Sequence, residues 1–341
     1  MLLREILGQD IAVNQLQNAL RQNRISHGYL FVGPDGVGKR TTALAFAQAL
    51  NCLTRENGDG CGRCASCLKL AHGNHPNLHL IEPEGSTLRI QQIRAVQQSA
   101  QYRQLDAGWK VFVFLEADKL TLPAANSLLK VLEEPPANTV LILITKHTFG
   151  LLPTVLSRCQ KISFTHLSAS VIRELLITRH WLPAERASFV AALAGGNMTT
   201  ALAAAESGEL LQWREEAIGF LATLQTQPTP TIFQRVDQLE RERERLGWLL
   251  ETMILWCRDA LLWQETHDRT LLVNTDKVEE IMKVSLNSNQ LVQVLQALHE
   301  ARRYLQQNAN VRLTLESLFI ELHQIILGGN LYHDRSCGDS F

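Results

Sequence analysis

Short apolar runs alternate with helical patterns over the first half of the chain. Each run is continuous and bounded by turn residues, the pattern of a strand buried on both faces of a sheet. Helix candidates such as TTALAFAQALNC and PAANSLLKVLEEPP lie between the runs. The runs are GYLFVG at 28–33, LHLIEP at 78–83, WKVFVFLEA at 109–117, TVLILIT at 139–145 and KISF at 161–164. This alternation predicts an α/β domain over residues 1–165, with a largely parallel sheet covered by helices.

The strand pattern stops after about residue 166, and the rest of the chain has helical patterns. Pro183 and the pair Gly195-Gly196 separate three short apolar helical patterns, which are typical of a small helical domain. A longer helical region follows, interrupted most clearly by TQPTPT at 226–231, and is typical of a helix bundle. The pattern therefore predicts a small helical domain at 166–207, an all-α domain at 208–328 and a flexible tail at 329–341.

The composition is that of an ordinary folded protein. A length of 341 residues agrees with two or three domains, and 45% hydrophobic residues can form a substantial core. A net charge of −1 argues against a broad cationic surface that would bind nucleic acid without partners. The N-terminus lacks the apolar run of a secretory signal, and no stretch resembles a membrane span. We therefore expect a cytoplasmic protein with reduced cysteines.

A glycine-rich loop follows the first predicted strand and precedes a helix. Its sequence is Gly33-Pro34-Asp35-Gly36-Val37-Gly38-Lys39. In this context the glycines let backbone N–H groups surround a phosphate, and the lysine reaches its outer oxygens. The candidate nucleotide-binding residues are therefore Gly33, Gly36, Gly38 and Lys39. A relic loop that no longer binds ATP fits the sequence equally well, so ATP binding is left open.

Two positions that would hold a magnesium ion carry unsuitable side chains. The residue after Lys39 should offer a Ser or Thr hydroxyl to the metal, but it is Arg40. The third predicted strand should end in an Asp-Glu pair, but it ends in Leu115-Glu116, and Asp118 lies beyond the strand. Because hydrolysis depends on positioning and charge neutralisation, we expect that this chain does not hydrolyse ATP.

Four cysteines form a C-x8-C-x2-C-x2-C array after the first helix of the α/β domain. They are Cys52, Cys61, Cys64 and Cys67. Four thiolates complete a tetrahedral zinc shell, and two-residue spacers let neighbouring cysteines turn toward one ion. A disulfide framework suits a secreted protein, and a redox CxxC motif does not need four cysteines. The array therefore predicts a structural zinc site without an open catalytic position.

An arginine precedes the fifth predicted strand, in Leu156-Ser157-Arg158-Cys159. It lies at the edge of the predicted nucleotide-binding domain, where a planar guanidinium could reach the γ-phosphate of a nucleotide on another subunit. On spacing alone, a surface or salt-bridged arginine is the simpler interpretation.

Taken together, these segments resemble the bacterial clamp-loader family of AAA+ proteins. The resemblance rests on GYLFVGPDGVGK, the four cysteines, NSLLKVLEEPPANTVLILIT, LPTVLSRCQKISF and NANVRLTLESLFIEL, and it covers nearly the whole chain. The run SLLKVLEEPP followed by SRC is highly specific, whereas the phosphate loop alone would fit many unrelated NTPases. The resemblance implies an AAA+ P-loop domain with an inserted zinc module at about 52–67, a helical lid and a helical collar that holds subunits together.

Departures from the motor subunits of this family, called gamma and tau, imply a non-motor subunit. Motor subunits keep Lys-Ser/Thr in the loop, an Asp-Glu pair after the third strand, and a second sensor arginine where this chain has Thr199. The resemblance implies that Arg158 is an arginine finger that completes the ATP site of a neighbouring subunit. It also implies that Thr145 matches a first sensor position and Gly8-Gln9 an adenine-side motif.

The implied function is that of a non-hydrolysing subunit of the DNA polymerase III clamp loader, which loads the sliding clamp onto primed DNA. The implied partners are the gamma/tau motor subunits and the clamp-opening delta subunit. One alternative is an active motor ATPase, which Arg40 and Leu115 oppose. Another is a zinc-dependent DNA-binding module, but Arg55, Arg63 and Lys69 lie around the cysteines without interleaved aromatic residues.

Overall fold

Two compact units make up the chain in a computed structural model. The model describes residues 1–101, 108–223, 236, 239–240 and 242–327. The first unit comprises Met1–Val171 together with Gly195–Thr200, and the second comprises Ile172–Ala194 together with the described residues from Ala201 onward.

A sheet of five parallel strands is the centre of the first unit as described. The strands are β1 at Gly28–Val32, β2 at Leu78–Ile81, β3 at Lys110–Phe114, β4 at Thr139–Thr145 and β5 at Gln160–Ser163. Their order across the sheet is β2-β3-β4-β1-β5. In this register Leu30 of β1 lies between Leu143 of β4 and Lys161 of β5. The parallel sheet predicted from the apolar runs is therefore confirmed.

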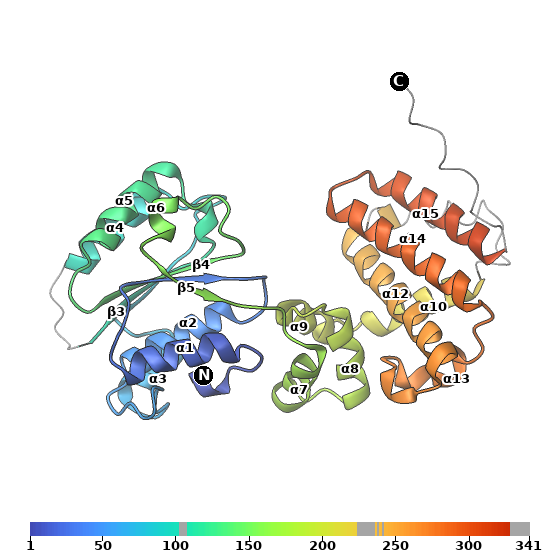
Figure 1. Cartoon of the computed structure of the whole chain (residues 1–341), viewed down its shortest axis with the longest axis horizontal. Coiled ribbons are helices and arrows are strands. Elements are labelled where there is room, and N and C mark those ends of the chain that lie inside the picture. The colour runs from blue at the N-terminus through green and yellow to red at the C-terminus, as the bar shows by residue number, and fades with distance from the viewer. Residues whose placement is uncertain (102–107, 224–235, 237–238, 241, 328–341) are drawn as a thin grey trace, which may run out of the picture. The chain divides into compact units, whose positions relative to one another are not determined.

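Helices cover both faces of the sheet (Figure 1), and successive residues of a strand face opposite helical layers. Tyr29 and Phe31 of β1 are buried in one apolar cluster, whereas Leu30 between them belongs to a second cluster on the other face. Burying such a side chain stabilises the fold by about 1.5–3 kcal/mol, so continuous apolar strands favour this two-sided arrangement. One layer consists of α1 at Asp10–Arg21 and α2 at Lys39–Leu50, and the other of α4 at Ile90–Gln101, α5 at Leu122–Glu133 and α6 at Pro153–Leu156.

The direction of the strands separates the predicted site residues into two groups. In a parallel sheet all carboxyl ends lie at one edge. The glycine-rich loop follows β1, Leu115 follows β3 and Thr145 ends β4, so all three lie at the carboxyl edge. Arg158 precedes β5 and therefore lies at the opposite, amino edge. The remaining short elements of this unit are η1 at Leu3–Glu5, α3 at Ala65–Ala71 and η2 at Ala117–Lys119.

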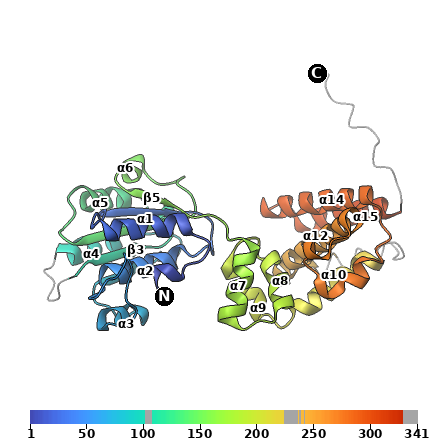
Figure 2. The ribbon, with the colours of Figure 1, turned by 60° about the horizontal axis from the view of Figure 1, so that its bottom comes forward.

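The second unit is helical in its described residues (Figure 2). Its core joins apolar side chains of several helices, and the rings of Phe220 and Phe319 lie 4.8 Å apart in it. Asn287 and Asn310 cap the last two helices by accepting bonds from backbone N–H groups. Within the described part of the chain, no helix is long and apolar enough to cross a membrane. The helices from residue 169 onward are α7 at Ala169–His180, α8 at Ala184–Leu193, α9 at Met198–Glu206, α10 at Leu210–Thr223, α12 at Arg243–Thr266, η3 at Arg269–Leu271, η4 at Thr275–Lys277, α13 at Val278–Ile281, α14 at Ser288–Gln306 and α15 at Val311–Ile326.

The helical C-terminal region expected from the sequence is confirmed. The boundaries predicted at 165/166 and 207/208 stay predictions. The break predicted at 226–231 and the tail predicted at 329–341 lie outside the described residues.

Candidate functional site

The glycine-rich loop connects β1 directly to α2. Gly36 and Gly38 have φ angles of 66° and 94°, a backbone region that favours glycine. Gly33 packs against the end of β5, where a Cβ atom on this residue would lie 2.4 Å from the carbonyl oxygen of Phe164. The three glycines are therefore required by the backbone geometry itself, whether or not a ligand binds there.

The carbonyl groups of this loop are occupied by side chains and backbone of the same unit. The Lys39 ammonium donates to the carbonyl oxygens of Gly33 and Pro34. Gln9 Nε2 donates to the Val37 carbonyl at 3.3 Å. Burial lowers the pKa of Lys39, whose ammonium also lies 4.0 Å from the Asp35 carboxylate. Lys39 is thus held within its own loop.

The start of α9 and the residue before it cover the loop at Gly36. The Met198 N–H donates to the Gly36 carbonyl at 2.8 Å. A Cβ atom on Gly36 would lie 1.6 Å from Oδ1 of Asn197, so the amide of Asn197 occupies the space beside the glycine. Lys146, a residue that the sequence patterns did not single out, forms an ion pair of 2.5 Å with Asp35 of the loop.

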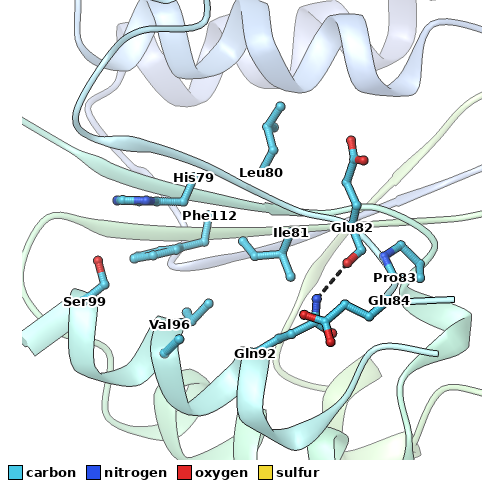
Figure 3. Close-up of a pocket in the computed structure, with 11 residues that line it drawn as sticks. His79, Leu80, Ile81, Glu82, Pro83, Glu84, Gln92, Val96, Ser99 and Phe112 are labelled. Carbon is cyan, nitrogen blue, oxygen red and sulfur yellow. Dashed lines mark hydrogen bonds between the residues drawn. The ribbon is translucent and has the colours of Figure 1, made fainter.

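Arg40, at the position of the expected metal-binding hydroxyl, contacts the end of β2. Its Nη2 atom lies 3.4 Å from Oε1 of Glu82. Figure 3 shows the Glu82 side chain turned away from Gln92, which donates instead to the Glu82 carbonyl at 2.8 Å. Glu82 and Gln92 line a pocket of about 660 Å³ between β2 and α4, whose lining also includes His79, Val96 and Ser99 but neither Arg40 nor a residue of the glycine-rich loop. Arg40 therefore binds a carboxylate of its own chain.

The expected metal-binding pair after β3 is also altered in the structure. Leu115 packs its side chain against the apolar cluster of α1 and α2. Glu116 has a φ of 51° and forms an ion pair of 2.5 Å with Lys119. Asp118 accepts a hydrogen bond of 2.8 Å from the Thr145 hydroxyl. In the sequence Asp118 lies beyond the predicted strand, and only the adjacency of β3 and β4 indicates this contact.

Arg158 is held by two groups at the amino edge of the sheet. Its Nη2 atom lies 2.9 Å from Oε1 of Glu133, the last residue of α5. Its Nη1 atom donates to the Thr154 carbonyl at 3.0 Å. The Arg158 side chain remains 36% exposed, so its guanidinium is accessible to a second molecule. The sequence patterns indicate Arg158 but give no signal for Glu133.

The four predicted cysteines come together in space. Their Sγ atoms all lie within 4.8 Å of one another, and those of Cys61 and Cys67 are 4.0 Å apart. Sulfur atoms at about 2.3 Å from a tetrahedral zinc ion would be about 3.8 Å apart, so the four residues fit such an ion. Backbone N–H groups point at three of the sulfur atoms. The nitrogen of Cys61 lies 3.2 Å from Sγ of Cys52, that of Cys64 lies 3.3 Å from Sγ of Cys61, and that of Cys67 lies 3.4 Å from Sγ of Cys64.

The environments of the four thiols differ. A hydrogen bond with the Thr54 hydroxyl is the largest cause that lowers the pKa of Cys61 to about 5, whereas burial raises the pKa of Cys67 to about 12. All four cysteines are free of disulfide bonds. The cluster could therefore hold a metal ion such as zinc, which binds thiolates.

Two protein-family models match the chain. One described as DNA polymerase III, delta subunit, matches residues 8–168, and one described as DNA polymerase III, delta subunit, C terminal, matches residues 209–324. The first match covers the sheet of the α/β unit and the second covers the described helices from α10 to α14 and most of α15, while α7, α8 and α9 lie between the two matches.

Similar curated proteins carry the corresponding names. DNA polymerase III subunit delta' of Bacillus subtilis is 32% identical over 317 residues, which cover 91% of this chain and 94% of that protein. Subunit delta' of Pseudomonas aeruginosa is 31% identical, and the aligned region covers 87% of this chain and 91% of that protein. DNA polymerase III subunit tau of B. subtilis is 26% identical, and the aligned region covers 94% of this chain but 61% of that protein.

Proposed function

We propose that this chain, which belongs to the delta-prime subunits of the DNA polymerase III clamp loader, completes the ATP site of a neighbouring subunit without hydrolysing ATP itself. In this proposal it is a fixed element of the loader that presents Arg158 to nucleotide bound next to it. ATP hydrolysis by the motor subunits then drives loading of the sliding clamp.

The location of Arg158 is the observation that supports this proposal most strongly. The residue lies at the amino edge of the sheet, whereas the glycine-rich loop of the same chain lies at the carboxyl edge. The two edges are separated by β1, whose five residues span about 17 Å. Arg158 therefore cannot reach a phosphate in its own loop, and its exposed guanidinium is suited to a phosphate on another subunit.

The absence of hydrolysis by the chain itself is supported by the two altered metal positions. Phosphoryl transfer needs a cation that bridges the outer phosphates and is held by a hydroxyl and a carboxylate. Arg40 offers neither group and contacts Glu82 instead, and Leu115 is apolar. The Asp118 carboxylate accepts a hydrogen bond from the Thr145 hydroxyl and is thereby held at the end of β4. We propose no role for ATP bound to this chain.

The four-cysteine cluster is proposed to hold a structural zinc ion. Cys52, Cys61, Cys64 and Cys67 would supply all four ligands, so no position remains for substrate or water. The ion would hold the two ends of the segment at about 52–67 together, because its ligands come from both ends. Its contribution is folding stability of this segment, not chemistry.

We further propose that the helical segments serve as a lid at 166–207 and a collar at 208–328, by analogy with the clamp-loader family. The direct partners would be the gamma/tau motor subunits and the delta subunit. The assembly as a whole would contact the sliding clamp and primed DNA. This assembly would act in the cytoplasm.

ATP turnover by the isolated chain tests whether this subunit is a motor. We expect no turnover with ATP and magnesium above the level of the Lys39→Ala variant. Turnover by the isolated wild-type chain that Lys39→Ala abolishes would contradict the proposal and support an active motor ATPase. Turnover that both proteins share would indicate a contaminating enzyme and calls for further purification before the comparison is repeated.

A further inference from the structure

The two most specific sequence segments of the chain, SLLKVLEEPP and SRC, meet in one contact. Glu133 ends α5 inside the first segment, and Arg158 lies inside the second. The Glu133 carboxylate accepts from Nη2 of Arg158 at 2.9 Å, while Nη1 donates to the Thr154 carbonyl at 3.0 Å. The guanidinium is thereby fixed at both terminal nitrogens.

The backbone beneath this guanidinium is fixed as well. Gly28 begins β1, and a Cβ atom there would lie 3.2 Å from both the Arg158 carbonyl oxygen and Sγ of Cys159, and 2.9 Å from a methyl group of Leu132. The Arg158 N–H also donates to the Val155 carbonyl at 3.2 Å. The Arg158 backbone therefore lies close to the start of β1, in a space that a side chain at Gly28 would enter.

We propose that Glu133 is a positioning residue that pre-orients Arg158 toward the nucleotide of the neighbouring subunit. This inference rests on the proposed function of Arg158. A free arginine side chain populates many rotamers, and holding it in one of them lowers the entropy lost when it meets a phosphate. Glu133 itself does not touch the nucleotide.

The strength of the contact suits this role. The Arg158 and Glu133 side chains are 36% and 48% exposed, and exposed ion pairs are weak. Such a pair orients the guanidinium, but a more highly charged phosphate can replace the carboxylate as the partner of one guanidinium nitrogen when it binds. A deeply buried pair would instead hold the arginine permanently.

Steady-state ATP turnover of the reconstituted clamp loader tests the proposal. We expect Glu133→Ala to lower kcat about two- to fivefold, the range set by an exposed ion pair, with KM for ATP unchanged because ATP is bound by the neighbour. Glu133→Gln keeps an oxygen acceptor for Nη2 and should remain within about twofold of wild type. Glu134→Ala, which removes the next exposed carboxylate of the same segment, is the matched control and should have no effect.

A double variant separates positioning from a structural effect. In an Arg158→Ala background, Glu133→Ala should cause no further loss, because no side chain remains to be oriented. A further loss in this background, or a wild-type kcat for Glu133→Ala alone, would overturn the role of Glu133. If Arg158→Ala itself leaves turnover unchanged in an intact assembly, the proposed function of Arg158 fails, and this inference fails with it.

Discussion

The backbone N–H of Met198 donates a hydrogen bond of 2.8 Å to the carbonyl of Gly36 in the glycine-rich loop. These residues are far apart in the sequence, and the contact joins the start of α9 to the loop between β1 and α2. Asn197 lies beside the same glycine and accepts a bond of 3.1 Å from the Thr200 N–H, which caps α9. The glycine-rich loop thus serves as a docking surface for residues of the same unit.

Substitution of Gly36 should weaken the start of α9. An alanine Cβ would displace the Asn197 amide from the cap, which costs about 0.5–2 kcal/mol in addition to backbone strain at positive φ. Gly38→Ala is the matched control, because this residue has a positive φ but its added Cβ would meet no atom within 4 Å. Hydrogen exchange of the first-turn amides of α9 should accelerate in Gly36→Ala and not in Gly38→Ala. Equal exchange in the two variants would argue against the docking contact.

The purified chain should contain about one zinc ion, because four thiolates complete one tetrahedral shell. Cys64→Ser should lose the metal and accelerate hydrogen exchange in α3, whose first residues follow this cysteine, while β1 and β4 stay protected. Cys159→Ser, which lies outside the cluster, should keep the metal. Elemental analysis and exchange together test this expectation; a metal-free chain with full protection of α3 would refute it.

The helical unit should lose stability in acid through Asp276. Arg214 donates to both oxygens of this carboxylate at 2.7 Å and holds its pKa below the usual range. Because the pKa of Asp276 is lower in the folded than in the unfolded protein, the ionised carboxylate contributes its full stabilisation above the unfolded-state pKa of about 4. This contribution is lost as the pH falls toward the folded-state pKa. Urea unfolding followed by tryptophan fluorescence should therefore show a steeper loss below about pH 4 in wild type than in Asp276→Asn. Identical pH profiles would mean that the pair does not contribute.

Local patterns in the sequence were sufficient to predict the parallel sheet and to single out the cysteine cluster. The strands are continuous apolar runs because both faces of the sheet are buried, and Phe31 and Leu30 each face a helical layer. Two-residue spacers bring Cys61, Cys64 and Cys67 together at the start of α3, and Cys52 joins them from the end of α2 across a loop of eight residues. Both features depend on residues that are close in sequence.

Contacts between distant segments were not predictable in the same way. The pairs Arg158–Glu133 and Lys146–Asp35 join segments whose adjacency depends on strand order, which hydrophobic periodicity does not specify. The family resemblance implies only that Thr145 matches a first sensor position, and its bond to Asp118 arises because β3 and β4 are neighbours. Side-chain partners at the sheet edges therefore required the structure.

The most direct test of the central claim compares Arg158→Ala with Lys39→Ala in a reconstituted clamp loader, after assembly of each variant has been verified. The measured quantity is ATP turnover stimulated by primed DNA. Our account predicts that Arg158→Ala suppresses hydrolysis at the neighbouring site by about 10³-fold or more, the scale of an arginine finger, while Lys39→Ala leaves turnover near the wild-type value. The reverse result, with turnover lost in Lys39→Ala and kept in Arg158→Ala, would contradict the account and identify the chain as a working ATPase.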